Sequence, residues 1–189
     1  MAYSVLVPLA EGFEEIEMIV PVDMFRRAGW NVVTASIGQV SLTATRQTHH
    51  LADSEWGEAS QQEYDIVYLP GGQPGATHLL QFPPLLDYLQ NHYQKGGWLA
   101  AICAAPLILI EAGIIDEKTP FTLHPAHRQD AKDYAWTEER VVVHQKLITG
   151  MAAGIAPELT FRIFNEITGN QELSESVNAG LHFPKGFIS

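Results

Sequence analysis

Short and nearly uninterrupted apolar runs recur along this sequence, separated by longer stretches with helical spacing. The clearest runs are YSVLVPL (residues 3–9), DIVYL (residues 65–69) and WLAAIC (residues 98–103). Strands of this composition are typical of a parallel sheet that is covered by helices on both faces. We therefore expect an α/β fold with a mostly parallel central sheet. In such sheets, ligands bind beyond the carboxyl ends of the strands.

The rest of the chain continues the same alternation of strands and helices. Helices are expected over residues 14–28, 84–94, 104–112, 155–168 and 171–178. Further strands are expected over residues 30–36, 40–44, 48–51, 121–123, 141–144 and 147–149. The 189 residues contain no repeat or linker, so we expect a single domain over residues 1–189.

Charge and cysteine content exclude several function classes. The chain has 11 Lys and Arg against 22 Asp and Glu, a net charge of −11, which disfavours binding to nucleic acid or anionic membranes. No apolar stretch approaches the ~18 residues of a membrane span, and the start MAYSVLVPLAEGFEE lacks the features of a secretory signal. A single cysteine permits neither an internal disulfide nor a Cys-rich zinc site. We expect a cytoplasmic protein without a metal or other cofactor.

Cys103 lies where a predicted strand gives way to a predicted helix, in the run AAICAAPLIL. A tight turn there places the side chain above the sheet. The unpaired N–H groups of the helix start favour an anion and would lower the pKa of the thiol. A lone cysteine among apolar neighbours is equally consistent with a core position.

Candidate partners for this thiol follow other strand ends. Glu17 can reach the same crevice, although the cluster of glutamates around it is more simply explained as a solvated first turn of a helix. Gly71 and Gly72 could offer backbone N–H groups as an oxyanion pocket, or could form a plain turn. His124 could act as a general acid or base. Its spacing to His127 could suggest a metal, but no third ligand is evident.

Taken together, the stretches EEIEMIVPVDMFRRAG, DIVYLPGGQPGA, AAICAAPLIL and HPAH resemble the ThiJ/PfpI superfamily, and within it the DJ-1 branch. The likeness runs nearly end to end, in the same order and spacing. It implies a flavodoxin-like three-layer sandwich that forms a homodimer. It also implies that Cys103 is a reactive thiol in a strained turn and that Glu17 is protonated and hydrogen-bonds the thiolate. His124 matches the family's nearby histidine, and Gly72 a backbone donor position.

The resemblance also raises expectations about substrate and subunit contacts. Gly71, Gly72, Ala104 and Arg46 are expected to bind substrate or an oxyanion. An anion-binding arginine that close relatives carry after the late strand is replaced here by Met151. Because the family dimerises through its first helix, the apolar side chains of that helix are expected at the interface: Met18, Val22 and Phe25.

Three functions are compatible with these residues and with the resemblance. The first is cofactor-free glyoxalase or deglycase chemistry on reactive carbonyls or glycated proteins, with the Cys103 thiolate as nucleophile in a stress response. The second is a non-enzymatic redox sensor or chaperone that uses oxidation of the same cysteine. The third is a cysteine peptidase. It ranks lowest, because the histidine that follows the cysteine in that branch is Ala104 here.

Overall fold

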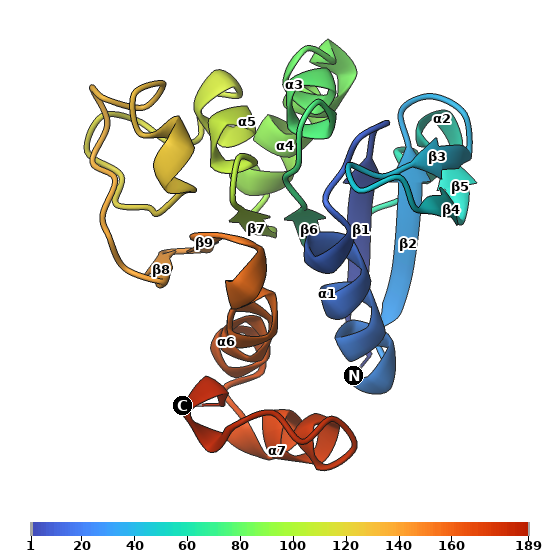
Figure 1. Ribbon diagram of the computed structural model, residues 1–189, viewed down its shortest axis with the longest axis vertical. Coiled ribbons are helices and arrows are strands. Elements are labelled where there is room, and N and C mark those ends of the chain that lie inside the picture. The colour runs from blue at the N-terminus through green and yellow to red at the C-terminus, as the bar shows by residue number, and fades with distance from the viewer. Residues whose placement is uncertain (1, 189) are drawn as a thin grey trace.

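The computed structural model describes residues 2–188 and shows a mixed α/β fold with a central sheet between helices (Figure 1). In chain order the strands are β1 (Ser4–Leu9), β2 (Asn31–Ser36), β3 (Ser41–Thr43), β4 (His49–Leu51), β5 (Ser54–Glu55), β6 (Ile66–Leu69), β7 (Trp98–Ile102), β8 (Val141–His144) and β9 (Leu147–Gly150). Seven of them form the central sheet in the order β5-β2-β1-β6-β7-β9-β8. All neighbours in it are parallel except β8 and β9, so the mostly parallel sheet is confirmed.

Helices cover both faces of this sheet. They are α1 (Glu15–Arg27), α2 (Trp56–Ala59), α3 (Gly75–Leu80), α4 (Pro83–Gln94), α5 (Pro106–Glu111), α6 (Ala156–Thr168) and α7 (Gln171–Ala179). α1 packs against α6 and α6 against α7, whereas α3, α4 and α5 pack together on the opposite face (Figure 1). The expected flavodoxin-like three-layer sandwich is therefore confirmed.

Successive residues of the central strands point into two separate cores. In β1, Val5 and Val7 pack in the core below α1 and α6, whereas Leu6 packs in the core below α3, α4 and α5. β6 divides in the same way, with Tyr68 in the first core and Val67 in the second. Because both faces are buried, both sets of side chains must be apolar. This explains the uninterrupted apolar runs in the sequence.

Residues 121–123, which were expected to form a strand, do not form one. Within the described chain, this segment makes a single isolated bridge, from Phe121 to Trp136. The N–H of Thr122 donates to the Thr149 hydroxyl at 3.0 Å, so a side chain takes the place of a ladder partner. The segment is fully buried, and its apolar pattern reports burial rather than pairing.

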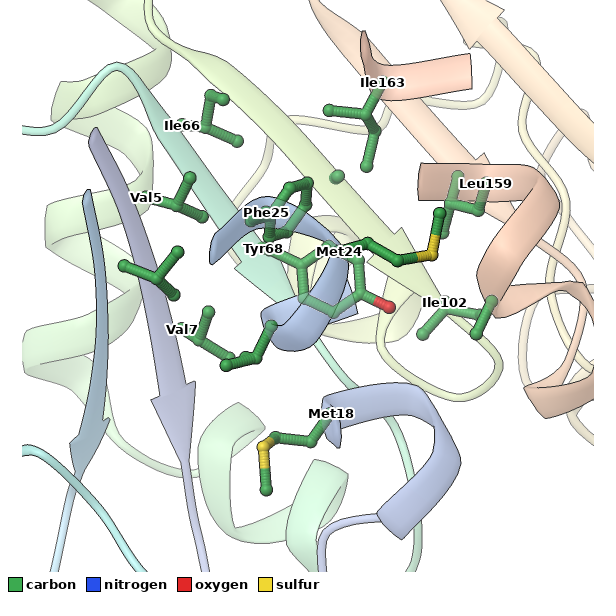
Figure 2. Packing of buried hydrophobic residues seen from close by; sticks show 14 of the residues in the cluster. Val5, Val7, Met18, Met24, Phe25, Ile66, Tyr68, Ile102, Leu159 and Ile163 are labelled. Carbon is green, nitrogen blue, oxygen red and sulfur yellow. The ribbon is translucent and has the colours of Figure 1, made fainter. Parts of the chain in front are cut away.

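The expected placement of Met18, Val22 and Phe25 at a subunit interface is wrong. Met18 and Val22 are 7% exposed and Phe25 is 0% exposed, so all three belong to the core of the chain itself. Figure 2 shows Met18 and Phe25 pointing from α1 into this core. The Phe25 ring lies edge-on to Tyr68 with 5.9 Å between centroids. These three side chains form the face of α1 that covers the sheet.

Candidate active site

Cys103 occupies the turn between β7 and α5 in a conformation that side chains rarely adopt. Its φ is +64°, in the left-handed region. Its N–H donates to the Gly150 carbonyl and its carbonyl accepts from the His124 N–H, both at 2.9 Å. Strain of this kind persists only where the surroundings over-determine the backbone, and it concentrates at functional sites. The thiol is half-buried at the carboxyl end of the sheet, as the sequence predicted.

Glu17 lies in the first turn of α1 and is completely buried. Its Oε2 accepts a hydrogen bond of 2.8 Å from the Gly71 N–H, and the carboxyl interacts with the Cys103 thiol. The other oxygen, Oε1, has no well-formed hydrogen bond. The Tyr68 hydroxyl donates to the Glu17 carbonyl at 2.9 Å and fixes the start of the helix. A solvated first turn is thus the wrong interpretation for Glu17.

The carboxyl and the thiol both hold protons more strongly than usual. Burial raises the pKa of Glu17 to about 7, with a smaller contribution from the charge of Glu14. Burial also raises the pKa of the Cys103 thiol, and a carboxylate at Glu17 raises it further. The lowered thiol pKa expected from the helix start is wrong, because desolvation and the neighbouring carboxylate outweigh the local N–H groups.

The two glycines after β6, Gly71 and Gly72, donate hydrogen bonds to different groups of the site. The N–H groups of Ala104 and Gly72 hydrogen-bond the sulfur and lower the pKa of Cys103, against the effect of burial. The Gly71 N–H is already taken by Glu17. A Cβ on Gly71 would lie 2.8 Å from Glu17 Oε2 and 2.9 Å from Ala104 N, so only glycine fits there. Gly72 and Ala104 therefore remain as the donors that face the sulfur.

His124 is joined to Cys103 through the backbone and is partly exposed. Its Nδ1 accepts from the Ala126 N–H at 3.2 Å, so the neutral ring carries its proton on Nε2. His127 instead pairs with Asp130 at 3.0 Å. Across residues 2–188, no group of three His, Cys, Asp or Glu side chains is placed to hold a metal ion.

Arg46 does not join this cluster. It is exposed in the turn between β3 and β4, where its N–H donates to Glu15 Oε1 at 2.7 Å. In that turn, Thr45 bonds to the carbonyls of Phe13 and Gln73, which attaches the hairpin to loops beside the site. The backbone of Arg46 therefore lies beside loops that border the site. In the described chain, no contact is seen between the Arg46 side chain and the Cys103–Glu17 pair.

Two residues of the site were not predicted from the sequence. Glu14 is the N-cap of α1, and its Oε2 accepts from the Glu17 N–H at 2.9 Å. The three-residue spacing from cap to Glu17 is the usual N-cap spacing and could have indicated this. Tyr68 belongs to a buried apolar run in which its hydroxyl gave no signal.

None of the described helices is both long enough and apolar enough to cross a membrane. The model of the DJ-1/PfpI family matches residues 3–166. The chain is 33% identical to Protein dj-1beta of Drosophila melanogaster over 178 residues, which cover 93% of this chain and 95% of the relative. It is 27% identical to the glutathione-independent glyoxalase DJR-1.2 of Caenorhabditis elegans over 162 residues, covering 86% and 87%.

Solved structures agree with these sequence comparisons. The crystal structure of Drosophila melanogaster DJ-1beta superposes with a TM-score of 0.91, covering 97% of this chain and 100% of the other. Oxidized Toxoplasma gondii DJ-1 superposes with a TM-score of 0.88 at 31% identity, covering 96% and 99%.

Proposed function

Because the chain belongs to the DJ-1/PfpI family, we propose that it is a cysteine-dependent enzyme acting on small reactive carbonyls in the manner of a cofactor-free glyoxalase. The observation that carries this proposal is the contact between the buried Glu17 carboxyl and the Cys103 thiol. A carboxyl whose pKa is about 7 can give and take a proton at neutral pH. The glyoxalase activity named for the Caenorhabditis elegans relative supports the same chemistry.

In this mechanism the sulfur of Cys103 bonds to the aldehyde carbon of methylglyoxal. The thiol proton passes through Glu17 to the aldehyde oxygen, which gives a hemithioacetal. Glu17 then removes the hydrogen from that carbon as a proton and returns it to the neighbouring ketone carbon, while the hydroxyl proton of the hemithioacetal passes to the ketone oxygen through an enediol. One carbon is oxidised and the other reduced, so no external oxidant is needed. Water cleaves the resulting thioester, releasing lactate and restoring the thiol.

His124 and the backbone donors complete the site in this proposal. The Nε2–H of the neutral His124 ring donates to a substrate oxygen. The N–H groups of Gly72 and Ala104, which face the sulfur, stabilise the oxyanion formed at the attacked carbon. In the deglycase variant of this function, the sulfur displaces the amine from the carbinolamine carbon of a glycated group. The C–N bond breaks, the amine leaves with the thiol proton, and the same hemithioacetal results. A free thiol is required throughout, which favours a reducing compartment such as the cytoplasm.

The test is the conversion of methylglyoxal to lactate by the wild type and by Cys103→Ser. We expect turnover by the wild type and a loss of at least about a hundredfold in the variant, because a serine hydroxyl is a much weaker nucleophile. Equal rates in the two proteins would contradict the proposal. Since the chain has one cysteine, alkylation of the wild type reports on this site alone.

A second function uses the same cysteine without turnover. Peroxide would oxidise the thiolate to a sulfenate and then a sulfinate, whose oxygens accept from Glu17 and from the N–H groups near the sulfur. The oxidized state of the Toxoplasma gondii relative favours this candidate. Mass spectrometry after mild peroxide treatment tests it. A Cys103 that gains no oxygen, or only a reducible product, removes the basis for a sensor.

We also propose that the protein forms a homodimer through the outer face of α1. Ile16 and Ile19 lie one turn apart on this helix and are 48% and 44% exposed. These two side chains, rather than the buried ones of the same helix, are the apolar groups available to a partner.

A further inference from the structure

Three hydrogen bonds join Glu14, Glu17 and Gly71 in a closed ring. The Glu14 N–H donates to the Gly71 carbonyl at 3.0 Å, and the Gly71 N–H donates to Glu17 Oε2 at 2.8 Å. The Glu17 N–H in turn donates to Glu14 Oε2 at 2.9 Å. Each residue donates once and accepts once. The ring therefore fixes the start of α1 to the loop after β6 and determines how the Glu17 carboxyl is held.

We propose that Glu14 is a positioning residue that holds Glu17 against Gly71 and uses its own negative charge to keep a proton on the Glu17–Cys103 pair. This inference rests on the proposed function only in that it concerns the same pair. Glu14 itself is half-buried and need not touch the substrate.

The packing around the ring leaves Glu14 little freedom. A Cβ on Gly72 would overlap the backbone of Glu14 and Phe13, so the loop after β6 lies directly against the cap. A Cβ on Gly71 would press on Glu17 Oε2. With backbone contacts this close, a change in the Glu14 side chain acts on Glu17 rather than being absorbed by the loop.

Capping alone does not explain a glutamate at this position. Serine, threonine, asparagine and aspartate are the preferred N-cap residues, and several of them cap a helix without a charge. The glutamate adds a negative charge close to a buried carboxyl, which raises the pKa of Glu17. The ionisable groups that face Glu17 are Cys103, Glu14 and the phenol of Tyr68, whose own pKa is raised well above its usual value. Glu14 is thus the neighbouring carboxyl group whose charge acts on Glu17.

Two variants separate position from charge. Glu14→Gln keeps an oxygen that can accept from the Glu17 N–H and removes the charge, whereas Glu14→Ala removes both. The Glu17 titration is followed by 13C NMR of its carboxyl carbon, assigned by its loss in Glu17→Gln. The orientation of Glu17 is followed by the rate of Cys103 alkylation by iodoacetamide. Glu172→Gln is the matched control, since it removes an exposed charge from the first turn of α7.

We expect the midpoint of the Glu17 titration to fall by about half a pH unit in both Glu14 variants. This is the effect of removing a like charge a few ångströms away in partly solvated surroundings. The alkylation rate well above the midpoint should stay within about twofold of wild type in Glu14→Gln and fall severalfold in Glu14→Ala. The control should change neither quantity.

An unchanged midpoint in Glu14→Gln would overturn the role of the charge. A Glu14→Ala protein whose Cys103 is alkylated at the wild-type rate would overturn the positioning role. Both readouts are made without a carbonyl substrate. A wild-type protein that fails to convert methylglyoxal therefore contradicts the proposed function and leaves the inference about Glu14 to be judged separately. Thermal unfolding of each variant shows whether the fold is kept, and Glu14→Gln provides the test if Glu14→Ala unfolds.

Discussion

The Glu17 carboxyl and the Cys103 thiol compete for protons in a space that admits little water. Burial raises the pKa of both groups, and each negative charge raises the cost of forming the other. Near neutral pH the pair therefore gives up its first proton. Whichever atom then holds the remaining proton, sulfur attack requires the singly ionised pair. The pair, rather than the cysteine alone, determines reactivity.

This coupling predicts the pH dependence of the reaction. We expect kcat/KM for methylglyoxal to rise with pH through about 7 and then level off, because Glu17 accepts a proton only above its pKa. In Glu17→Gln this rise should disappear and the rate should fall by about a hundredfold or more. Initial rates across the neutral range check this. A wild-type rate that falls with pH through the same range would contradict it.

At this scale the family resemblance implied the partnership of Cys103 and Glu17, whereas the residues alone favoured a solvated first turn, and the energetics were not predicted. Cys103 and Glu17 both follow strand ends that meet at one edge of a parallel sheet, so their approach follows from topology. The pKa values depend on how completely Glu17 is buried and on which N–H groups face each atom. Gly71 illustrates this: it was expected to bind substrate or an oxyanion, but its N–H donates to Glu17 Oε2 instead. Local sequence does not encode such distances.

At the scale of elements, the turn from β7 to α5 stores strain beneath the nucleophile. A non-glycine residue with φ near +64° costs about 1–2 kcal/mol relative to glycine. The turn is kept in this conformation by bonds from Cys103 to Gly150 of β9 and to His124. The sheet thus stabilises a left-handed conformation at Cys103 that the isolated turn would not adopt.

Relief of this strain is measurable. Cys103→Gly and Cys103→Ala both remove the thiol, but only alanine keeps a Cβ in the left-handed conformation. We expect the free energy of unfolding to be about 1 kcal/mol higher for Cys103→Gly than for Cys103→Ala. Urea unfolding of both proteins at one pH gives the comparison. An alanine variant that is equal to or more stable than the glycine variant would show that the turn carries no strain.

Elements differ in how visible they were in the sequence. The central strands were found because burial on two faces produces long apolar runs, as in β6 and β7. β5 has only two residues, too short for any periodicity to show. α3 has six residues and was also not expected. Residues 121–123 were instead predicted as a strand that does not form, because a buried loop has the same apolar sequence pattern as a strand. Length and burial, not propensity, therefore set the limit of the prediction.

At the scale of the whole molecule, the first helix serves the core and the surface at once. Its inner face is buried against the sheet, and Ile16 and Ile19 remain exposed on its outer face. A homodimer formed there would place the partner next to the residues that start α1, including Glu14 and Glu17. Subunit contact and active-site geometry would then share one element.

The homodimer can be tested with a single charge. We expect Ile19→Lys to shift the protein from dimer to monomer in analytical ultracentrifugation, because an ammonium group buried in an apolar contact is costly. Gln94→Lys adds the same charge to an exposed position on α4, at the other face of the sheet, and should leave the mass unchanged. A wild type that sediments as a monomer, or an Ile19→Lys protein that remains a dimer, would contradict this interface.

The two backbone hydrogen bonds of Cys103, to Gly150 and from His124, also determine when during synthesis the thiol reaches its folded surroundings. His124 and Gly150 leave the ribosome after Cys103, and β9 pairs with β7 only once both have been made. A nascent chain that ends before residue 150 lacks both the Gly150 carbonyl and the strand that hold the turn at Cys103. The chemistry of the site is therefore acquired late in synthesis, as a property of the finished sheet.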